Sequence, residues 1–326
     1  MRLRRRVLAA AFVAAAACLA PFAASHAQTY PAQPVRLIVP YVAGGLPDTV
    51  ARIVAQRLTE SLGQSFVVEN KPGAGGAVAA AALAQAPADG YAFMVTDGPM
   101  LAIQPFVNAK PAFNAQKDFV PVSLIGVAPL YLAVNAKVEA TTLDALVALA
   151  KAKPGALNYG SAGLGSIHHL TAEAMKAGLG TDITHVPFRG SGQSVPAMIG
   201  GQVDMVFASP PALMGFVQNG QARLIAINAA RRSPQAPDVP ALAEKIPGFD
   251  FAFTVVMLAR PGTPAAVVDK INAEVARIVK VPLVVEQLQK AGVDPEGAGV
   301  AQTAAALQAE LQRIAAAARH ANLRPE

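Results

Sequence analysis

Cysteine is almost absent from this chain of 326 residues, in which Cys18 is the only one. Cys18 falls inside an N-terminal segment with the features of a secretory signal peptide, so we expect the mature chain to contain no cysteine. This excludes a disulfide, a thiol nucleophile and a cysteine metal ligand. A protein without these has to be stabilised by its hydrophobic core, and a chain of this length is long enough to bury one.

The N-terminal segment has the composition of a signal peptide. It opens on four basic residues: Arg2, Arg4, Arg5 and Arg6. The apolar run Val7–Ala24 follows, and Ser25–Ala27 supplies the small residues of a cleavage site. We therefore expect residues 1–27 to be a signal peptide that is cleaved after Ala27, which predicts a location in the periplasm. An uncleaved anchor and a lipoprotein modified at Cys18 are the alternatives.

Charge is sparse, and its balance does not indicate a nucleic-acid partner. Charged residues make up 15% of the chain and the mean hydropathy is +0.37. No apolar run after residue 30 reaches the length of a membrane-spanning helix. The formal charge is +6, but four of the arginines belong to the expected signal peptide, which leaves about +2 on the mature chain.

The segment from Val35 to Leu62 predicts a strand, a glycine turn and a helix. Val35–Val39 is a short apolar run ended by Pro40, as in a buried strand. Two glycines follow, and Asp48 then opens a stretch with apolar residues at helical spacing. The start of a helix leaves N–H groups without partners, and these favour an anionic group. We expect this turn to form one wall of a ligand cleft.

The same alternation of strand, turn and helix continues along the chain and restarts near residue 143. It predicts an α/β fold with parallel sheets covered by helices on both faces. The chain is expected to cross out of the first unit through Val120–Gly126 and Leu130–Val134, and to cross back through Phe249–Leu258. Two units with two crossover segments predict two α/β lobes with a ligand cleft between them, because ligands of open sheets bind beyond the carboxyl ends of the strands. We expect residues 28–126 and 250–326 to form one discontinuous lobe and residues 127–249 the other.

Motifs for nucleotide binding, hydrolysis and metal binding are missing or incomplete. Gly160–Ser166 has the glycine spacing of a phosphate loop, but no lysine follows Gly165. No serine lies in a G-x-S-x-G elbow. His168 and His169 are adjacent, so on a helix they point about 100° apart and suit one metal ion poorly. We expect one of them to face the cleft and the other to pack or to be solvated, with no catalytic residue, no metal and no cofactor.

Short motifs that cover nearly the whole mature chain point to a known family. The first is Pro40-Tyr41-Val42-Ala43-Gly44-Gly45-Leu46-Pro47-Asp48, with Ala43 in place of a second proline. The others, in order, are Glu69–Gly76, Asp89–Tyr91, Pro121–Ile125, Tyr159–Ser166 followed by His169-Leu170, Val186–Gly190, Gly200–Asp204, Arg232–Pro234, Pro237–Pro240 and Pro261–Pro264. In their order and spacing they resemble the substrate-binding proteins of tripartite tricarboxylate transporters, the Bug or TctC type.

This resemblance implies a type II periplasmic-binding-protein-like fold with a cleft between its lobes. It also implies that backbone groups of the first loop hold a ligand carboxylate, partly through ordered waters that the acid of this loop helps to organise. The matching residues of the first loop are Tyr41, Gly45, Leu46 and Asp48. Those implied on the facing lobe are Gly163, Gly165, Ser166, Phe188 and Ala208.

The sequence departs from the family pattern where the distal half of the ligand is expected. Thr96 and Asp97 open a loop that is usually rich in Gly, Thr and Ser, and Ala208 stands where many members carry Asp or another polar group. These changes predict a ligand with one carboxylate and a less polar remainder. Asp97 instead favours a ligand with an amino group, since its carboxylate can pair with one.

The function predicted is that of a periplasmic solute-binding protein, not an enzyme. It is expected to capture a small carboxylate as a monomer and to deliver it to the membrane permease subunits of a tripartite tricarboxylate transporter. One alternative is a periplasmic sensor that signals to a membrane histidine kinase of a two-component system. A secreted hydrolase is the alternative from another class, and it lacks a visible nucleophile with its base.

Overall fold

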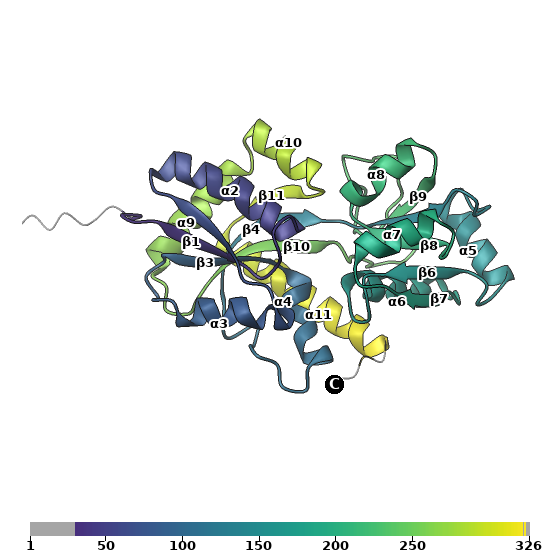
Figure 1. The fold of residues 1–326 in the computed structure, drawn as a ribbon, viewed down its shortest axis with the longest axis horizontal. Helices are drawn as coiled ribbons and strands as arrows, with labels where there is room; N and C mark the ends of the chain where they lie inside the picture. Colours follow the sequence, from purple (N-terminus) through teal and green to yellow (C-terminus); the bar gives the residue numbers. More distant parts are fainter. Residues whose placement is uncertain (1–29, 322, 324–326) are drawn as a thin grey trace, which may run out of the picture. The chain divides into compact units, whose positions relative to one another are not determined.

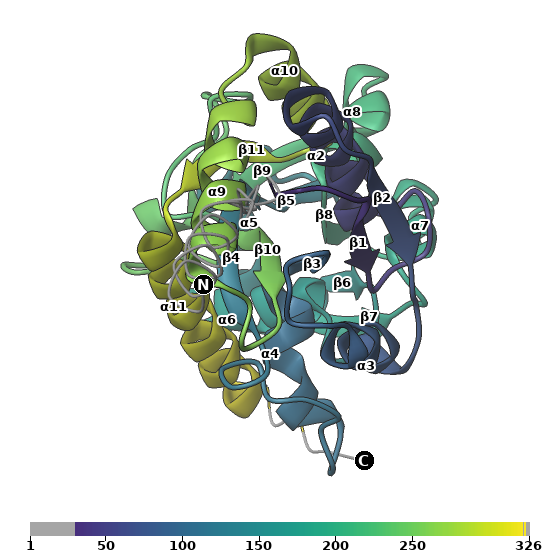
Figure 2. The ribbon, with the colours of Figure 1, turned by 90° about the vertical axis from the view of Figure 1, so that its left-hand side faces the viewer.

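The computed structural model describes residues 30–321 and residue 323, so the expected signal peptide lies outside the described residues. From residue 33 onward the chain folds into α/β structure with two sheets, seen from two directions in Figures 1 and 2. No helix within the described residues is both long and apolar enough to cross a membrane.

The first sheet has six strands in the order β11-β4-β10-β3-β1-β2. They are β1 (Val35–Val39), β2 (Phe66–Asn70), β3 (Ala92–Asp97), β4 (Val120–Ala128), β10 (Phe253–Ala259) and β11 (Asp294–Ala298). Strand β1 is parallel to β2 and β3, whereas β10 is antiparallel to β3 and β4. The prediction of a parallel sheet is therefore wrong for this side of the sheet. The crossover strands β4 and β10 pair with each other, and β10 joins the edge of β3 in the opposite direction.

Helices cover both faces of the first sheet (Figure 1). One face carries α2 (Leu46–Leu62), α9 (Ala265–Ile278) and α10 (Pro282–Lys290). The other carries η1 (Ala74–Gly76), α3 (Ala77–Gln85), α4 (Gly98–Val107) and α11 (Val300–His320). Of the apolar positions predicted at helical spacing, Val50, Val54 and Leu58 are buried and Ile53 is half-buried. The helix ends at Gly63, whose left-handed φ of 71° lets its N–H donate to the Thr59 carbonyl.

The second sheet has five strands in the order β7-β6-β8-β5-β9. They are β5 (Tyr131–Asn135), β6 (Asn158–Ser161), β7 (Thr184–Pro187), β8 (Met205–Ala208) and β9 (Ala222–Ile227). Its helices are α5 (Leu143–Ala152), α6 (Ile167–Leu179), α7 (Ser191–Ile199) and α8 (Pro210–Gln218), with α7 and α8 on one face and α6 on the other (Figure 1). Strand β6 is parallel to β7 and β8, and β5 is antiparallel to β8 and β9.

Two elements of the structure are not predicted from the sequence. Helix α8 begins with Pro210 and Pro211, and proline is favoured in the first turn of a helix because that turn needs no N–H. Strand β11 reads Asp-Pro-Glu-Gly-Ala, which contains no residue of high strand propensity. Its extended conformation follows from pairing with β4, a strand that lies far from β11 in the sequence.

Asn228 joins the two segments that cross between the sheets. The β4–β5 crossover contains Leu130, and the β9–β10 connection runs through η2 (Leu242–Glu244) to Phe251. The Asn228 side chain accepts from the Leu130 N–H at 2.7 Å and donates to the Phe251 carbonyl at 2.7 Å. Its backbone also bonds to both residues. One fully buried asparagine therefore holds the two crossovers together.

Candidate functional site

A cavity of about 400 Å³ lies at the carboxyl ends of the parallel strands β1, β2, β3 and β6. It is lined from the first sheet by Pro40, Tyr41, Gly73, Gly75, Gly76, Asp97, Pro99, Met100, Ile103, Gln104 and Phe253, and from the second by Ala162, Gly165, Ser166, Ile167 and His168. The starts of α3, α4 and α6 therefore all border it. Ligands of open α/β sheets bind at this end of the strands.

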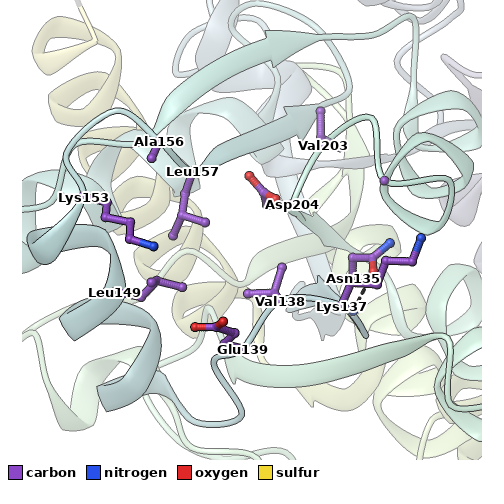
Figure 3. Close-up of a pocket in the computed structure, with 11 residues that line it drawn as sticks. Asn135, Lys137, Val138, Glu139, Leu149, Lys153, Ala156, Leu157, Val203 and Asp204 are labelled. Carbon is purple, nitrogen blue, oxygen red and sulfur yellow. Dashed lines mark hydrogen bonds between the residues drawn. The ribbon is translucent and has the colours of Figure 1, made fainter.

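Other cavities of similar size lie elsewhere. One of about 390 Å³ contains Asn135 at the end of β5, together with Leu157 and Asp204, which precede β6 and β8 (Figure 3). It thus opens at the amino ends of the parallel strands, away from the helix starts. A larger cavity of about 660 Å³ runs along the side of α4. Neither has the strand-end position of a ligand site, so we take the cavity at the helix starts as the candidate site.

Tyr41 and Asp97 form a hydrogen-bonded pair on the wall of this cavity. The Tyr41 hydroxyl donates to Asp97 Oδ2 at 2.7 Å, and the Met100 N–H donates to Oδ1 at 2.9 Å, which makes Asp97 the N-cap of α4. Burial raises the pKa of Asp97, and these two donors oppose the rise. Burial and the neighbouring Asp97 raise the pKa of Tyr41 well above its usual value, so Tyr41 remains a hydroxyl donor.

Positive charge is missing from the described residues that line the cavity. None of them is Lys or Arg, and burial lowers the pKa of His168 to about 4, which leaves it neutral near pH 7. Donors are present at the start of α6, where Ser166 is the N-cap and accepts from the His169 N–H. The N–H groups of Ile167 and His168 in this first turn have no acceptor within the helix. Such groups can hold a carboxylate without an arginine.

The loop between β6 and α6 is held in a conformation that requires glycine. Gly163 and Gly165 have φ angles of 118° and 74°. The Ser166 hydroxyl donates to the Gly163 carbonyl at 2.7 Å, and the Gly165 N–H donates to Nδ1 of His169 at 3.2 Å. The position of this cavity wall therefore depends on an unprotonated ring nitrogen of His169.

Three rings stack behind this loop. The ring of His185 lies 4.8 Å from that of Tyr159 and 4.3 Å from that of His169, with 18° between the planes in both pairs. The His185 Nε2 is 2.7 Å from the Ser161 hydroxyl. Burial, with the nearby His169, lowers the pKa of His185 to about 4, and burial also lowers that of His169. His168 instead lines the cavity, whereas His169 is buried. Of the two alternatives for the second histidine, packing or exposure to solvent, the structure shows packing.

Asp48 organises the loop after β1. It is 2% exposed and accepts hydrogen bonds from the Gly44 N–H at 2.9 Å, the Asn70 amide at 2.8 Å and the Arg52 guanidinium at 3.0 Å. Burial alone would raise the pKa of Asp48, but the donors from Arg52, Gly44 and Asn70 outweigh it and lower the pKa. Asp48 therefore ties α2 to the end of β2, with Gly45 as the N-cap of α2.

Replacing Asp48 with alanine is expected to cost about 1 to 2 kcal/mol of unfolding free energy, because three donors lose a charged acceptor. Urea denaturation followed by circular dichroism measures this cost. Asp269→Ala is the matched control, since Asp269 is an exposed residue on α9. Equal stability of the Asp48 variant and the wild type would contradict the role given to this carboxylate.

The residues predicted to bind ligand fall into three groups. Those that line the cavity are Tyr41, Asp97, Gly165 and Ser166. Those outside the lining but near it in the chain are Gly45, Leu46 and Asp48 at the start of α2, and Gly163 in the loop before α6. The remaining three lie elsewhere: Thr96 and Ala208 are fully buried in strands, and Phe188 packs on the core of the second sheet. Ligand contact by any of these residues stays a prediction.

Several lining residues were not predicted. The glycine turn Gly73–Gly76 follows the parallel strand β2, so the position of a turn after a parallel strand is a signal that could have found it. Met100, Ile103 and Phe253 contribute apolar surface, and nothing in their local sequence distinguishes them from core residues. Among the described residues there is no group of three or more His, Cys, Asp or Glu side chains that could hold a metal ion.

Comparison with known proteins identifies the family. The profile described as "Tripartite tricarboxylate transporter family receptor" matches residues 50–323. The chain belongs to this receptor family. The receptor is 35% identical over 310 residues to the protein BugT of Bordetella pertussis, an alignment that covers 94% of each chain.

Solved structures of similar proteins agree with this assignment. The structure of R. palustris Rpa4515 with adipate has a TM-score of 0.79 and 32% identity, covering 91% of this receptor and all of that chain. MatC of Rhodopseudomonas palustris with bound malate has a TM-score of 0.72 and 30% identity, covering 89% of this receptor and all of that chain. The predicted two-lobed, type II-like fold is confirmed, and the receptor has a solute-binding role.

Proposed function

We propose that this receptor is a periplasmic solute-binding protein that binds a small carboxylate and delivers it to the permease of a tripartite tricarboxylate transporter. The observation that supports this most is the cavity at the strand ends, bordered by the starts of three helices and lined by no Lys or Arg among the described residues. Free N–H groups at a helix start are suited to a carboxylate. The adipate and malate in structures of its relatives support the same ligand class.

We also propose that residues 28–126 and 250–326 form one lobe and residues 127–249 the other. The strands of the first sheet lie within 35–128 and 253–298, and those of the second lie within 131–227. Closure of such lobes on a ligand takes place at the segments that join them. Asn228, which bonds to both crossovers, is the expected hinge point.

Native mass spectrometry of the mature protein, purified without added ligand, tests the ligand class. A bound mass that is released on denaturation and identified as a carboxylic acid is the expected result. If the purified protein carries no bound ligand, it is then screened by thermal shift against monocarboxylates, dicarboxylates, tricarboxylates and amino acids. Stabilisation by at least one carboxylate supports the proposal, because a ligand that binds only the native state raises its stability. A bound compound without a carboxylate, or an empty protein that no carboxylate stabilises, would overturn it.

A further inference from the structure

The end of the cavity formed by Asp97 and Tyr41 presents hydrogen-bond acceptors. The hydroxyl of Tyr41 has one proton, and it is used in the bond to Asp97, so its oxygen can only accept from a ligand. The carboxylate of Asp97 accepts two hydrogen bonds, from Tyr41 and Met100, whereas an ionised carboxylate has about four acceptor positions. Acceptor capacity therefore remains on a side chain that lines the cavity and is 8% exposed.

The start of α4 is closed to a ligand carboxylate. The Asp97 carboxylate already occupies the position of an anion there, since it caps the helix through the Met100 N–H. Pro99, in the first turn, has no N–H to offer. The start of α6 differs, because its cap is the neutral hydroxyl of Ser166. A ligand carboxylate is therefore directed toward α6 and away from Asp97.

A second carboxyl group lies directly behind Asp97. A Cβ atom on Gly98 would clash with Glu310 Oε2, so the Glu310 carboxyl lies directly against the start of α4. Glu310 is 1% exposed, and Asp97 contributes to its raised pKa. Arg313 opposes the rise in the pKa of Glu310, and it forms an ion pair with Asp250 at 3.4 Å. The raised pKa of about 8 keeps Glu310 mostly protonated near pH 7, so the Asp97 carboxylate is the acidic group at this end of the cavity, and none of the described lining residues is Lys or Arg.

We infer that Asp97, oriented by Tyr41, selects carboxylates that also carry a protonated amino group and discriminates against dicarboxylates. The inference rests on the proposed function, because it assumes that the cavity holds a carboxylate. An ammonium group donates to the remaining acceptor positions of Asp97 and supplies the missing positive charge. A second carboxylate at the same place would put like charges together and leave acceptors facing acceptors. Tyr41 acts here as a positioning residue.

Two ligand series that differ at one end only provide the test. The amino acids are β-alanine, γ-aminobutyrate and δ-aminovalerate, and the dicarboxylates with the same methylene chains are succinate, glutarate and adipate. Affinities are measured by isothermal titration calorimetry on the mature wild type and on Asp97→Asn, Tyr41→Phe and Asp269→Asn. Asparagine is as good an N-cap as aspartate, so Asp97→Asn retains the start of α4. Asp269→Asn removes the same charge from an exposed position.

In the wild type we expect the best amino acid to bind at least about tenfold more tightly than its matched dicarboxylate. Asp97→Asn should weaken amino-acid binding by about tenfold to a hundredfold, since it removes a hydrogen bond to a charged group, and it should not weaken dicarboxylate binding. Tyr41→Phe should reduce the preference less, and Asp269→Asn should leave it unchanged.

The results that overturn the inference differ from those that overturn the proposed function. If the wild type prefers the dicarboxylates, the assignment of Asp97 is wrong while carboxylate binding stands. The same holds if Asp97→Asn weakens both series equally, because a purely structural role affects both. If carboxylates neither co-purify with the wild type nor bind to it, the proposed function fails, and this inference fails with it.

Discussion

Glu310→Gln is expected to raise the unfolding free energy by about 3 kcal/mol at pH 7 and to remove a downward slope of stability between pH 4.5 and 8. The reason is a carboxyl group buried in α11 that has no cationic partner at hydrogen-bond distance within the described part of the chain. The carboxyl of Glu310 bonds to Thr254, whose hydroxyl and N–H lie 2.5 Å and 3.2 Å from Oε2. Burial raises the pKa of Glu310 to about 8, opposed mainly by these Thr254 bonds.

The sign follows from proton binding in the two states. Between its usual pKa of 4.5 and the raised value of about 8, Glu310 is protonated in the folded protein and ionised in the unfolded chain. The folded state therefore binds more protons, and stability falls as the pH rises through this window. The charged neighbours are Asp97, which adds to the rise in pKa, and Arg313, which opposes it and pairs with Asp250.

Glutamine is suited to this test because it resembles the protonated acid. Its carbonyl can accept from the Thr254 N–H, and its amide can donate to the Thr254 hydroxyl. Urea denaturation at intervals from pH 5 to 8, followed by circular dichroism because the chain has no tryptophan, gives the slope. Glu139→Gln, at an exposed position, is the control. A wild type and a Glu310→Gln variant with the same slope would show that Glu310 is ionised in the fold.

Part of this site could be predicted from the sequence, because local patterns determine local elements. The run Val35–Val39 and its glycine turn gave the strand and helix at the predicted places. The burial of Glu310 could also have been predicted, because Glu310 lies on the buried stripe of α11, between Leu307 and Ile314. A charged residue on an apolar stripe indicates a buried acid.

The rest depends on contacts between distant parts of the chain. Asn228 bonds to Leu130 and Phe251. The residues next to it in the sequence do not distinguish it from an asparagine in an ordinary loop. The direction of β10 is set by pairing with β3 and β4, more than a hundred residues earlier in the chain. The pairing of Tyr41 with Asp97 likewise joins the ends of two strands that meet only in the sheet.

The double variant His168→Gln, His185→Phe should resist acid better than the wild type. Relative to their difference at pH 7.5, we expect the variant to gain about 3 kcal/mol of unfolding free energy at pH 4.5. Burial lowers the pKa of both histidines from 6.5 to about 4. His168 is expected to contribute the larger share, because His185 is only about half buried and solvent screens part of its effect.

The change of unfolding free energy with pH that we expect from the two histidines is opposite in sign to the change expected from Glu310. Between pH 6.5 and 4 both histidines are neutral in the folded protein and protonated in the unfolded chain, so the unfolded state binds more protons. The stability that they contribute is complete above pH 6.5 and is lost as the pH falls toward 4. The titratable groups around His185 are His169, Glu173 and Lys176, and the hydroxyl of Ser191 bonds to His168 Nε2 at 3.0 Å.

Acidification raises the unfolding free energy through Glu310 and lowers it through the two histidines. The pH dependence of the wild-type stability alone therefore cannot separate the two effects. The difference between the double variant and the wild type isolates the histidines, and the single variants divide it between them. Phenylalanine preserves the stack of Tyr159, His185 and His169, and Ser161 still has the Gly163 carbonyl as an acceptor. Parallel loss of stability by the double variant and the wild type would mean that neither histidine is held neutral by the fold.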